Sequence, residues 1–347
     1  MKKLACLLYL AAVCTAVASS ACAGKSDDDY KREVTRDMHA SIGADLAELA
    51  QAARDLQAVA PAHAWDPTQD AAAISTMRDA WLRARVAYEL VEGATAPLFP
   101  DQDFAMDARY DDYLVELGPD GDADPFDGVG ATGMHSIERI LFAPEIRDEV
   151  IAFERTLPGY RAAAYPATDA DAIEFKTELV GQLIADADDL HSQWAPAAID
   201  IGAAYIGLVG LMNEQREKVN LAATGEEESR YANVTLFDLR NNLAGTRKVY
   251  ELFRAWIAAS DGEHADAMIQ IKFSELATLY TATSGDALPP VPSTWSSDAP
   301  SPADLATPFG MVWQQVHAAT DPARSESIVA QMNAIATLLG FPQFVEE

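Results

Sequence analysis

Apolar residues recur at steps of three and four along most of this chain, and this spacing constrains the fold more than any other feature. Steps of three and four place side chains on one face of an α-helix. No segment shows the alternation with hairpin turns that is typical of strands. The chain is therefore predicted to be all-α. The clearest run covers six turns with Leu236, Leu239, Leu243, Thr246, Tyr250, Phe253 and Ile257.

The same spacing predicts a series of further helices, with two four-helix-type bundles in series over residues 31–195 and 196–347. Long helices usually pack as antiparallel bundles, and Pro196 interrupts the pattern between the two halves. Two segments are predicted to be irregular: 93–133, rich in Gly, Pro and Asp, and 284–303, with five prolines. An irregular stretch as long as the first is often functional. The predicted helices cover about 30–60, 77–91, 134–156, 170–195, 198–222, 236–257, 264–283, 304–319 and 323–340.

The first residues predict export. Lys2 and Lys3 precede an apolar run, Leu4–Val17, and small residues at 18–21 lead to Cys22. This order is typical of a secretory signal peptide, and the run is too short to span a bilayer. A cysteine directly after small residues resembles a bacterial lipoprotein cleavage site. We therefore expect a signal peptide over 1–21 and lipidation at Cys22, against the alternative of an ordinary signal peptide with a coincidental cysteine.

The cysteine positions agree with this expectation. Cys6 and Cys14 would leave with the signal peptide, and Cys22 would become the first residue of a mature chain without an internal disulfide. Residues 22–30 are expected to form a solvated tether. The predicted location is the cell envelope or periplasm, at the outer or inner membrane, with membrane contact only through the lipid.

The charge excludes one large class of partners. The chain has 25 basic and 54 acidic side chains, a net charge of −29. Such a surface repels phosphate backbones, so no nucleic acid is expected as a partner. A surface of this sign attracts cations in general, although most of the carboxylates are expected to be solvated helix faces.

A histidine and a glutamate mark the first candidate site. Gly133 ends a loop, a helix is expected to begin near Thr132, and His135 and Glu138 lie three residues apart on it. This spacing places both side chains on one face of the helix, where one turn can offer a nitrogen and an oxygen to one ion. A helical histidine often has a carboxylate three residues away by chance, so the pair alone is a weak signal.

A second acidic pair lies on the preceding long helix. Arg85, Glu89 and Glu92 follow one another at steps of four and three, next to the apolar face and directly before the irregular segment. One interpretation is a solvated edge with an Arg–Glu pair, and the other is two carboxylates inside a metal-binding bundle. An aspartate of the irregular segment could complete such a site: Asp101, Asp103, Asp107, Asp111 or Asp112.

Four blocks follow one another along nearly the whole chain after residue 22. They are Ala-Arg-Val-Ala-Tyr-Glu-Leu-Val-Glu at 84–92, Gly-Met-His-Ser-Ile-Glu-Arg at 133–139, the Gly-Glu-Glu to Ala-Gly run at 225–245, and the ending at 307–341. Together they resemble the imelysin-like family, which includes EfeO-type components of iron uptake. The resemblance implies a fold of two helical bundles with a metal site in a cleft between helices. Carried over residue by residue, it implies the ligands His135, Glu138, Glu89, Glu92, Asp107 and Glu227.

Two departures from the family pattern leave alternatives open. The segment before the histidine is longer than expected, so the aspartate could be Asp103, Asp107 or Asp111. Tyr231 comes one residue later than usual, so the glutamate could be Glu226 or Glu227, with Glu214 as an outside candidate.

The expected function is that of an envelope metal-binding protein in iron uptake. A site of carboxylates and one imidazole suits iron, ferrous or ferric, with zinc or calcium as alternatives. The expected partner is an inner-membrane iron permease or another uptake component. Two alternatives are a metallopeptidase that uses His135 and Glu138, and a ligand-binding lipoprotein whose metal site has degenerated. The chain has no His-Glu-x-x-His motif, which favours a binding protein over an enzyme.

Overall fold

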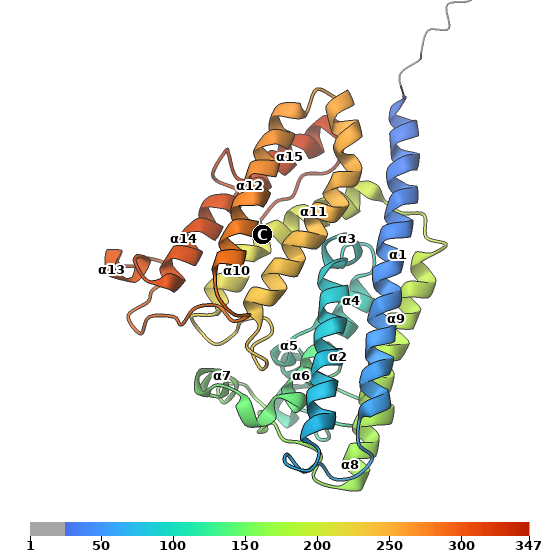
Figure 1. Ribbon diagram of the computed structural model, residues 1–347, viewed down its shortest axis with the longest axis vertical. Coiled ribbons are helices and arrows are strands. Elements are labelled where there is room, and N and C mark those ends of the chain that lie inside the picture. The colour runs from blue at the N-terminus through green and yellow to red at the C-terminus, as the bar shows by residue number, and fades with distance from the viewer. Residues whose placement is uncertain (1–24, 347) are drawn as a thin grey trace, which may run out of the picture.

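The computed structural model describes residues 25–346, and in this range it contains helices and no strand, which confirms the all-α class (Figure 1). The predicted signal peptide and Cys22 lie outside the described residues. Within the described part of the chain, no helix is long and apolar enough to cross a membrane. The longer helices are α1 (Asp27–Val59), α2 (Ala71–Glu89), α9 (Val180–Trp194), α10 (Ile201–Leu221), α11 (Thr235–Ala259), α12 (Glu263–Ala282), α14 (Pro308–Thr320) and α15 (Ile328–Leu339).

The first half is built on α1, which packs against α2 and α9 along its length (Figure 1). Its buried face, which includes Met38, Ile42 and Leu46, repeats at the predicted steps. The helix begins earlier than expected, because Ser26 caps it and Asp29 completes a capping box. Residues 27–30 are therefore helical, although the sequence interpretation placed them in a tether.

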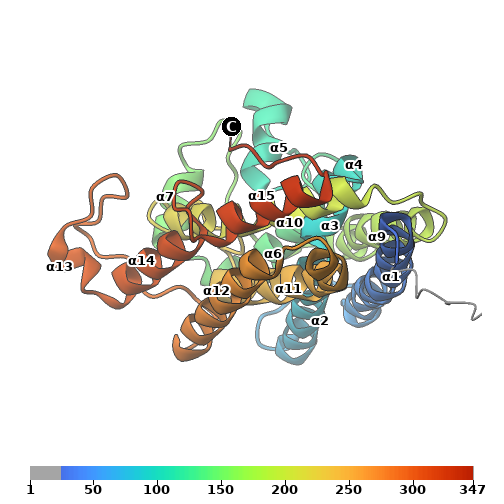
Figure 2. The same cartoon turned by 90° about the horizontal axis from the view of Figure 1, so that it is seen from above.

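The second half packs α10 against α11, α14 and α15, and α12 against α11 and α15. Seen from above, α1, α2 and α9 lie on one side, α12, α13 and α14 on the other, and α3 (Glu92–Thr95), α10, α11 and α15 between them (Figure 2). One continuous cluster of buried apolar side chains extends through both halves. Because the two halves share this core, the division at 195/196 remains a prediction.

The segment expected to be irregular contains short helices instead: α3, α4 (Pro100–Asp107) and α5 (Tyr110–Leu117). Pro100 occupies the first turn of α4, where its missing N–H costs nothing. Helices of this length are too short to show an apolar repeat, so the Gly, Pro and Asp content of the segment led to the prediction of irregular structure.

Three predicted helices differ from the expected ones. The expected helix 134–156 divides into α6 (Gly133–Leu141) and α7 (Asp148–Glu154), because Pro144 lies in a short turn between them. The last helix, α15, begins at Ile328 because the Ser327 side chain accepts a hydrogen bond from the Ala330 N–H. The expected helix 170–195 is α8 (Asp169–Glu174) and α9, joined by a π-helical turn over Phe175–Leu179.

The two halves approach closely where α10 crosses α3. A Cβ atom on Gly207 of α10 would overlap the carbonyl oxygen of Gly93. The same corner of the first half meets α11, where a Cβ on Gly245 would overlap the backbone of Leu90. Glycine at these positions lets the second half contact the segment that carries Glu89 and Glu92.

We expect Gly207→Ala to lower the free energy of unfolding by about 1–3 kcal/mol, because the added methyl group must push the α3 backbone away. Gly210 on the same helix is the matched control, since its Cβ would meet only Phe344 at 3.5 Å. Gly210→Ala should stabilise the chain by up to about 1 kcal/mol through helix propensity. Denaturant unfolding of both variants measures the difference, and equal effects would contradict the close crossing.

Candidate metal centre

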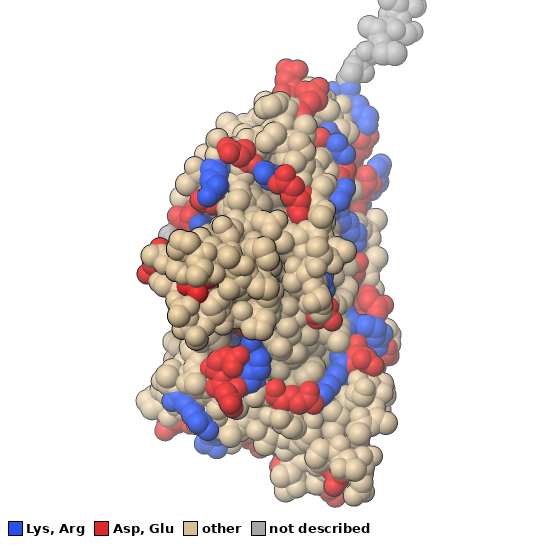
Figure 3. Space-filling view, turned by 60° about the vertical axis from the view of Figure 1, so that its left-hand side comes forward, with Lys and Arg blue, Asp and Glu red and all other residues tan. Residues whose placement is uncertain are grey.

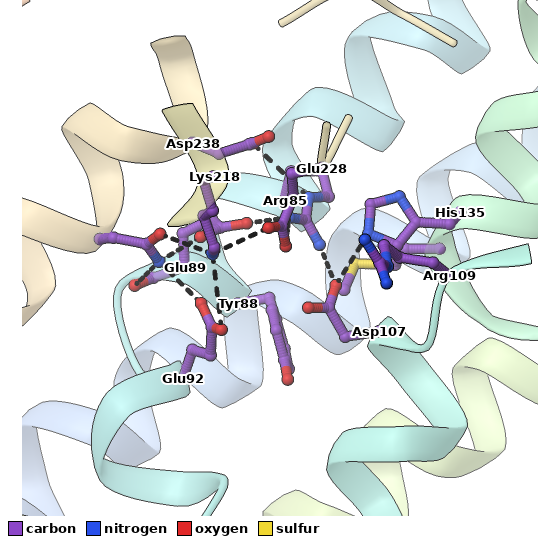
Figure 4. Close-up of polar contacts among 12 residues, drawn as sticks. Arg85, Tyr88, Glu89, Glu92, Asp107, Arg109, His135, Lys218, Glu228 and Asp238 are labelled. Atoms are coloured by element: carbon purple, nitrogen blue, oxygen red, sulfur yellow. Dashed lines mark hydrogen bonds and ion pairs between the residues drawn. The ribbon is translucent and has the colours of Figure 1, made fainter. Parts of the chain in front are cut away.

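Ionisable side chains from both halves of the chain meet in one buried cluster (Figure 4). The first half contributes side chains from α2, α3, α4 and α6, and the second contributes side chains from α10, α11 and the segment 222–234 between them. We call residues 226–232 the glutamate loop, because it carries the glutamates that follow Gly225.

His135 and Glu138 lie together on α6, as their spacing requires. The His135 Nδ1 atom lies 2.8 Å from Glu138 Oε2, where its N–H donates to the carboxylate. The other oxygen, Oε1, accepts from the backbone N–H groups of Tyr231 at 2.9 Å and Ala232 at 2.8 Å. Glu138 is fully buried, so both of its oxygens are engaged within the protein. Its carboxylate therefore orients the imidazole and the glutamate loop.

The other nitrogen of His135 faces two carboxylates. Nε2 is buried and has no hydrogen bond among the described residues, and it lies 3.4 Å from Asp107 Oδ1. One ligand atom each from Asp107, His135 and Glu228 lies within 4.8 Å of the others. An ion with bonds of about 2.0–2.6 Å can join atoms at this separation after small side-chain shifts. The three residues therefore form the best-placed group of donors in the cluster.

Glu89 and Glu92 reach the same cluster but contact the protein's own donors. Glu89 accepts hydrogen bonds from Arg85 and from the Asn242 amide. Glu92 accepts from Asn242 at 2.7 Å and lies 3.7 Å from the Lys218 ammonium. In Figure 4 these two carboxylates lie on the other side of Arg85 from Asp107 and His135.

Arg85 lies at the centre of the cluster and is fully buried (Figure 4). Its guanidinium contacts Asp107, and it approaches Glu228 at 3.4 Å and Asp238 at 3.7 Å. Lys218 is the second buried cation and lies 3.0 Å from Glu228. Carboxylates outnumber Arg85 and Lys218 in the cluster, so the cluster is predominantly acidic.

Burial and charge move the pKa values of these groups in opposite directions. Burial alone would lower the pKa of His135, but the carboxylates of Asp107 and Glu138 raise it to about 9. Burial alone would raise the pKa of Glu228, but Lys218 and Arg85 lower it to about 2. An ion that bonds to Nε2 must therefore displace a proton from His135, while Glu228 is already ionised.

Three further candidates from the sequence lie outside the group formed by Asp107, His135 and Glu228. Asp103 accepts from the Tyr88 hydroxyl, and burial raises its pKa to about 7. Asp111 pairs with Arg230. Glu214 is half-buried near Glu92, and desolvation raises its pKa to about 8.

Neither glutamate that the family pattern suggested points to His135. The buried Glu227 pairs with Arg147 and lines a pocket of about 1100 Å³ between α7, α12 and α14. That pocket lies on the side of the molecule that carries α13 (Pro302–Leu305) and α14, where the surface is largely uncharged (Figure 3). Glu226 contributes its carbonyl oxygen, which accepts from Arg109 at 3.1 Å.

The glutamate loop is held by contacts with α5, α6 and α7 of the first half. The Tyr231 hydroxyl donates to Glu154 at 2.6 Å, and Arg139 binds the same carboxylate at 3.0 Å. Arg230 binds Asp111 of α5. These contacts fix the backbone that presents Glu228 to the cluster and two N–H groups to Glu138.

Sequence reasoning missed Glu228 and Lys218. Glu228 is the third of three consecutive glutamates, and only the loop conformation decides which one faces the cluster. A signal for Lys218 exists: Asn213, Gln215 and Lys218 interrupt the apolar positions of α10, and all three are buried. Buried polar residues on a helix of this kind need partners.

Comparison with known proteins decides the family. The imelysin family model matches residues 42–339 of the chain. The chain belongs to the imelysin family. Its helices also match an imelysin-like protein from Psychrobacter arcticum with a TM-score of 0.58 at 13% identity, over 92% of this chain and 98% of that one. The imelysin fold predicted from the sequence is therefore confirmed.

The chain is also similar in sequence to named proteins of iron uptake and to a lipoprotein. The chain is 26% identical to the iron uptake system component EfeM of Pseudomonas syringae over 54% of this chain and 52% of that protein. It is 27% identical to the iron uptake system component EfeO of Escherichia coli K12 over 56% of this chain and 41% of EfeO. It is 26% identical to an EfeM/EfeO family lipoprotein of Staphylococcus haemolyticus over 80% of this chain and 84% of that protein. The alignments thus span about half of EfeM and less of EfeO.

Proposed function

We propose that this imelysin-family chain binds a metal ion as cargo, most suitably iron, through Asp107, His135 and Glu228, and takes part in iron uptake. The observation that carries the proposal is the buried His135 Nε2, which faces Asp107 while Glu138 fixes the ring from the other side. A histidine whose second nitrogen donates to a carboxylate is the usual arrangement of a metal-binding imidazole. Two carboxylates and one imidazole suit ferrous iron, and also zinc or manganese.

The names of the relatives support the uptake role and the location. EfeM and EfeO are named as iron uptake components, and the Staphylococcus relative is named a lipoprotein. The proposal includes removal of a signal peptide over 1–21, a lipid anchor at Cys22 and a place at the cell envelope or periplasm. An iron permease or another uptake component would receive the ion.

The geometry supports binding better than peptide hydrolysis. A metallopeptidase needs a carboxylate that is free to act as a base beside the ion. Glu138 cannot serve readily, because its two oxygens already accept three hydrogen bonds from the protein. Asp107 and Glu228 are the proposed ligands and already contact Arg85, so neither is free to act as the base.

Anaerobic titration with ferrous iron tests the function. The wild-type chain is expected to bind one ion tightly, and His135→Ala is expected to lose at least tenfold in affinity, because it removes the single nitrogen ligand. His264→Ala, a change at an exposed histidine, is the matched control. A casein-cleavage assay on the same samples tests the peptidase alternative. Cleavage that depends on His135 would overturn the proposal, and absence of both binding and cleavage would favour a degenerate site.

A further inference from the structure

Arg85 contacts both carboxylates of the proposed metal site. Its guanidinium pairs with Asp107 and lies 3.4 Å from Glu228, the two anionic ligands. On the other side it pairs with Glu89 and approaches Asp238. Figure 4 shows it between Asp107 and the group that contains Glu89 and Asp238. A bound ion would therefore share its nearest anions with a fixed cation.

The charge of Arg85 is permanent. A guanidinium does not lose its proton under conditions in which proteins fold. Every ion that enters the site therefore meets one positive charge next to its ligands, whatever the pH. Lys218 adds a second one on the far side of Glu228, at 3.0 Å.

Coulomb repulsion grows with the charge of the ion, so a trivalent ion is repelled by Arg85 half as strongly again as a divalent one at the same position. The same positive charge partly offsets the negative charge of Glu89 and Asp238, so the net attraction of the cluster for a highly charged ion is lower than its carboxylates alone would give.

We propose that the positive charge of Arg85 makes this site bind divalent metal ions in preference to trivalent ones. The inference rests on the proposed function, because it concerns the same site. It assigns Arg85 a role in specificity and not in coordination: a guanidinium has no lone pair to offer a metal. The cargo that fits the site is accordingly ferrous and not ferric iron.

The test compares Co²⁺ with Ga³⁺, two ions without redox chemistry under the assay conditions, by competition with a chelator of known affinity. The measured quantity is the ratio of the Ga³⁺ to the Co²⁺ association constant. Arg85→Gln is expected to raise this ratio at least tenfold, and Arg85→Lys, which keeps the charge, is expected to restore it to within about threefold of wild type. Arg216→Gln, which changes an arginine of α10 that pairs with Glu346, is the control and should leave the ratio unchanged.

A second variant tests the same idea in the opposite direction. Asp238 lies outside the ligand set, and its carboxylate lies 3.7 Å from the Arg85 guanidinium, next to the ligands that Arg85 contacts. Asp238→Asn removes this negative charge and is expected to lower the ratio severalfold at pH 8. This variant retains Arg85, so the inference stays testable if Arg85→Gln fails to fold.

The outcomes separate the two proposals. If the wild-type chain binds neither ion, the proposed function fails. If it binds the ions but Arg85→Gln and Asp238→Asn both leave the ratio within twofold of wild type, only the role of Arg85 is overturned. A ratio that rises equally in Arg85→Gln and Arg85→Lys would also overturn it, because charge would then not be the cause.

Discussion

Glu228→Gln is expected to weaken ferrous iron binding by at least tenfold, whereas Glu227→Gln is expected to change it by less than about threefold. The two residues are adjacent in the sequence and have the same chemistry, but only Glu228 lies within 4.8 Å of the ligand atoms of Asp107 and His135. Glu227 pairs with Arg147 instead. Neutralising Glu228 also leaves Lys218 and Arg85 with one anion fewer, and their charge then repels the ion.

Anaerobic calorimetry of the two variants under identical conditions measures this difference. Circular dichroism of each variant shows whether the helical content is unchanged. The family pattern on its own suggests the opposite order, with Glu226 or Glu227 as the ligand. A larger loss in Glu227→Gln than in Glu228→Gln would therefore show that the glutamate loop binds the ion in another conformation.

Glu138→Ala is expected to lower the free energy of unfolding by about 3–5 kcal/mol. The substitution removes the acceptor for the N–H groups of Tyr231 and Ala232 and for the Nδ1–H of His135. Each buried donor left without a partner costs about 1–3 kcal/mol. The double change of His135 and Glu138 to alanine is therefore a poor test of binding, because it would also loosen the glutamate loop.

Glu138→Gln separates the two roles of this side chain. Its amide oxygen can still accept from Tyr231 and Ala232, so most of the stability should be retained. Its amide N–H₂ would face His135 Nδ1 and favour the tautomer with a proton on Nε2, which blocks the metal-binding nitrogen. We expect near-normal urea unfolding with a tenfold or greater loss of iron affinity. A stable Glu138→Ala variant, within 1 kcal/mol of wild type, would contradict this assignment.

The helical architecture could be predicted because a single periodicity extends through long segments. The stripe through Met38, Ile42 and Leu46 faces the core, as its steps of four require. Helix ends were harder, because caps such as Ser26 and Ser327 act over a few residues and do not alter the apolar repeat. The short helices α4 and α5 could not be predicted because eight residues contain too few apolar positions to show a period.

The site could be predicted only where two of its residues share one helix. His135 and Glu138 come from one turn, so their proximity follows from local geometry. The sequence could not tell that Glu138 would use both oxygens on the protein, because its partners Tyr231 and Ala232 come from the other half. The separation of Glu228 from Glu227 depends on a loop conformation fixed by distant contacts, such as that between Arg230 and Asp111.

Because the cluster lies between the two halves, a bound ion would affect the stability of the chain. Asp107 and His135 come from the first half and Glu228 from the second, so a bound ion ties together segments that are distant in the chain. Such an ion acts as a reversible cross-link between the two halves. At a free ion concentration one hundred times the dissociation constant, it would add about 2.7 kcal/mol to the stability of the chain. The two halves would therefore separate more easily at the contact between α3 and α10 in a protein that has released its ion than in one that still binds it.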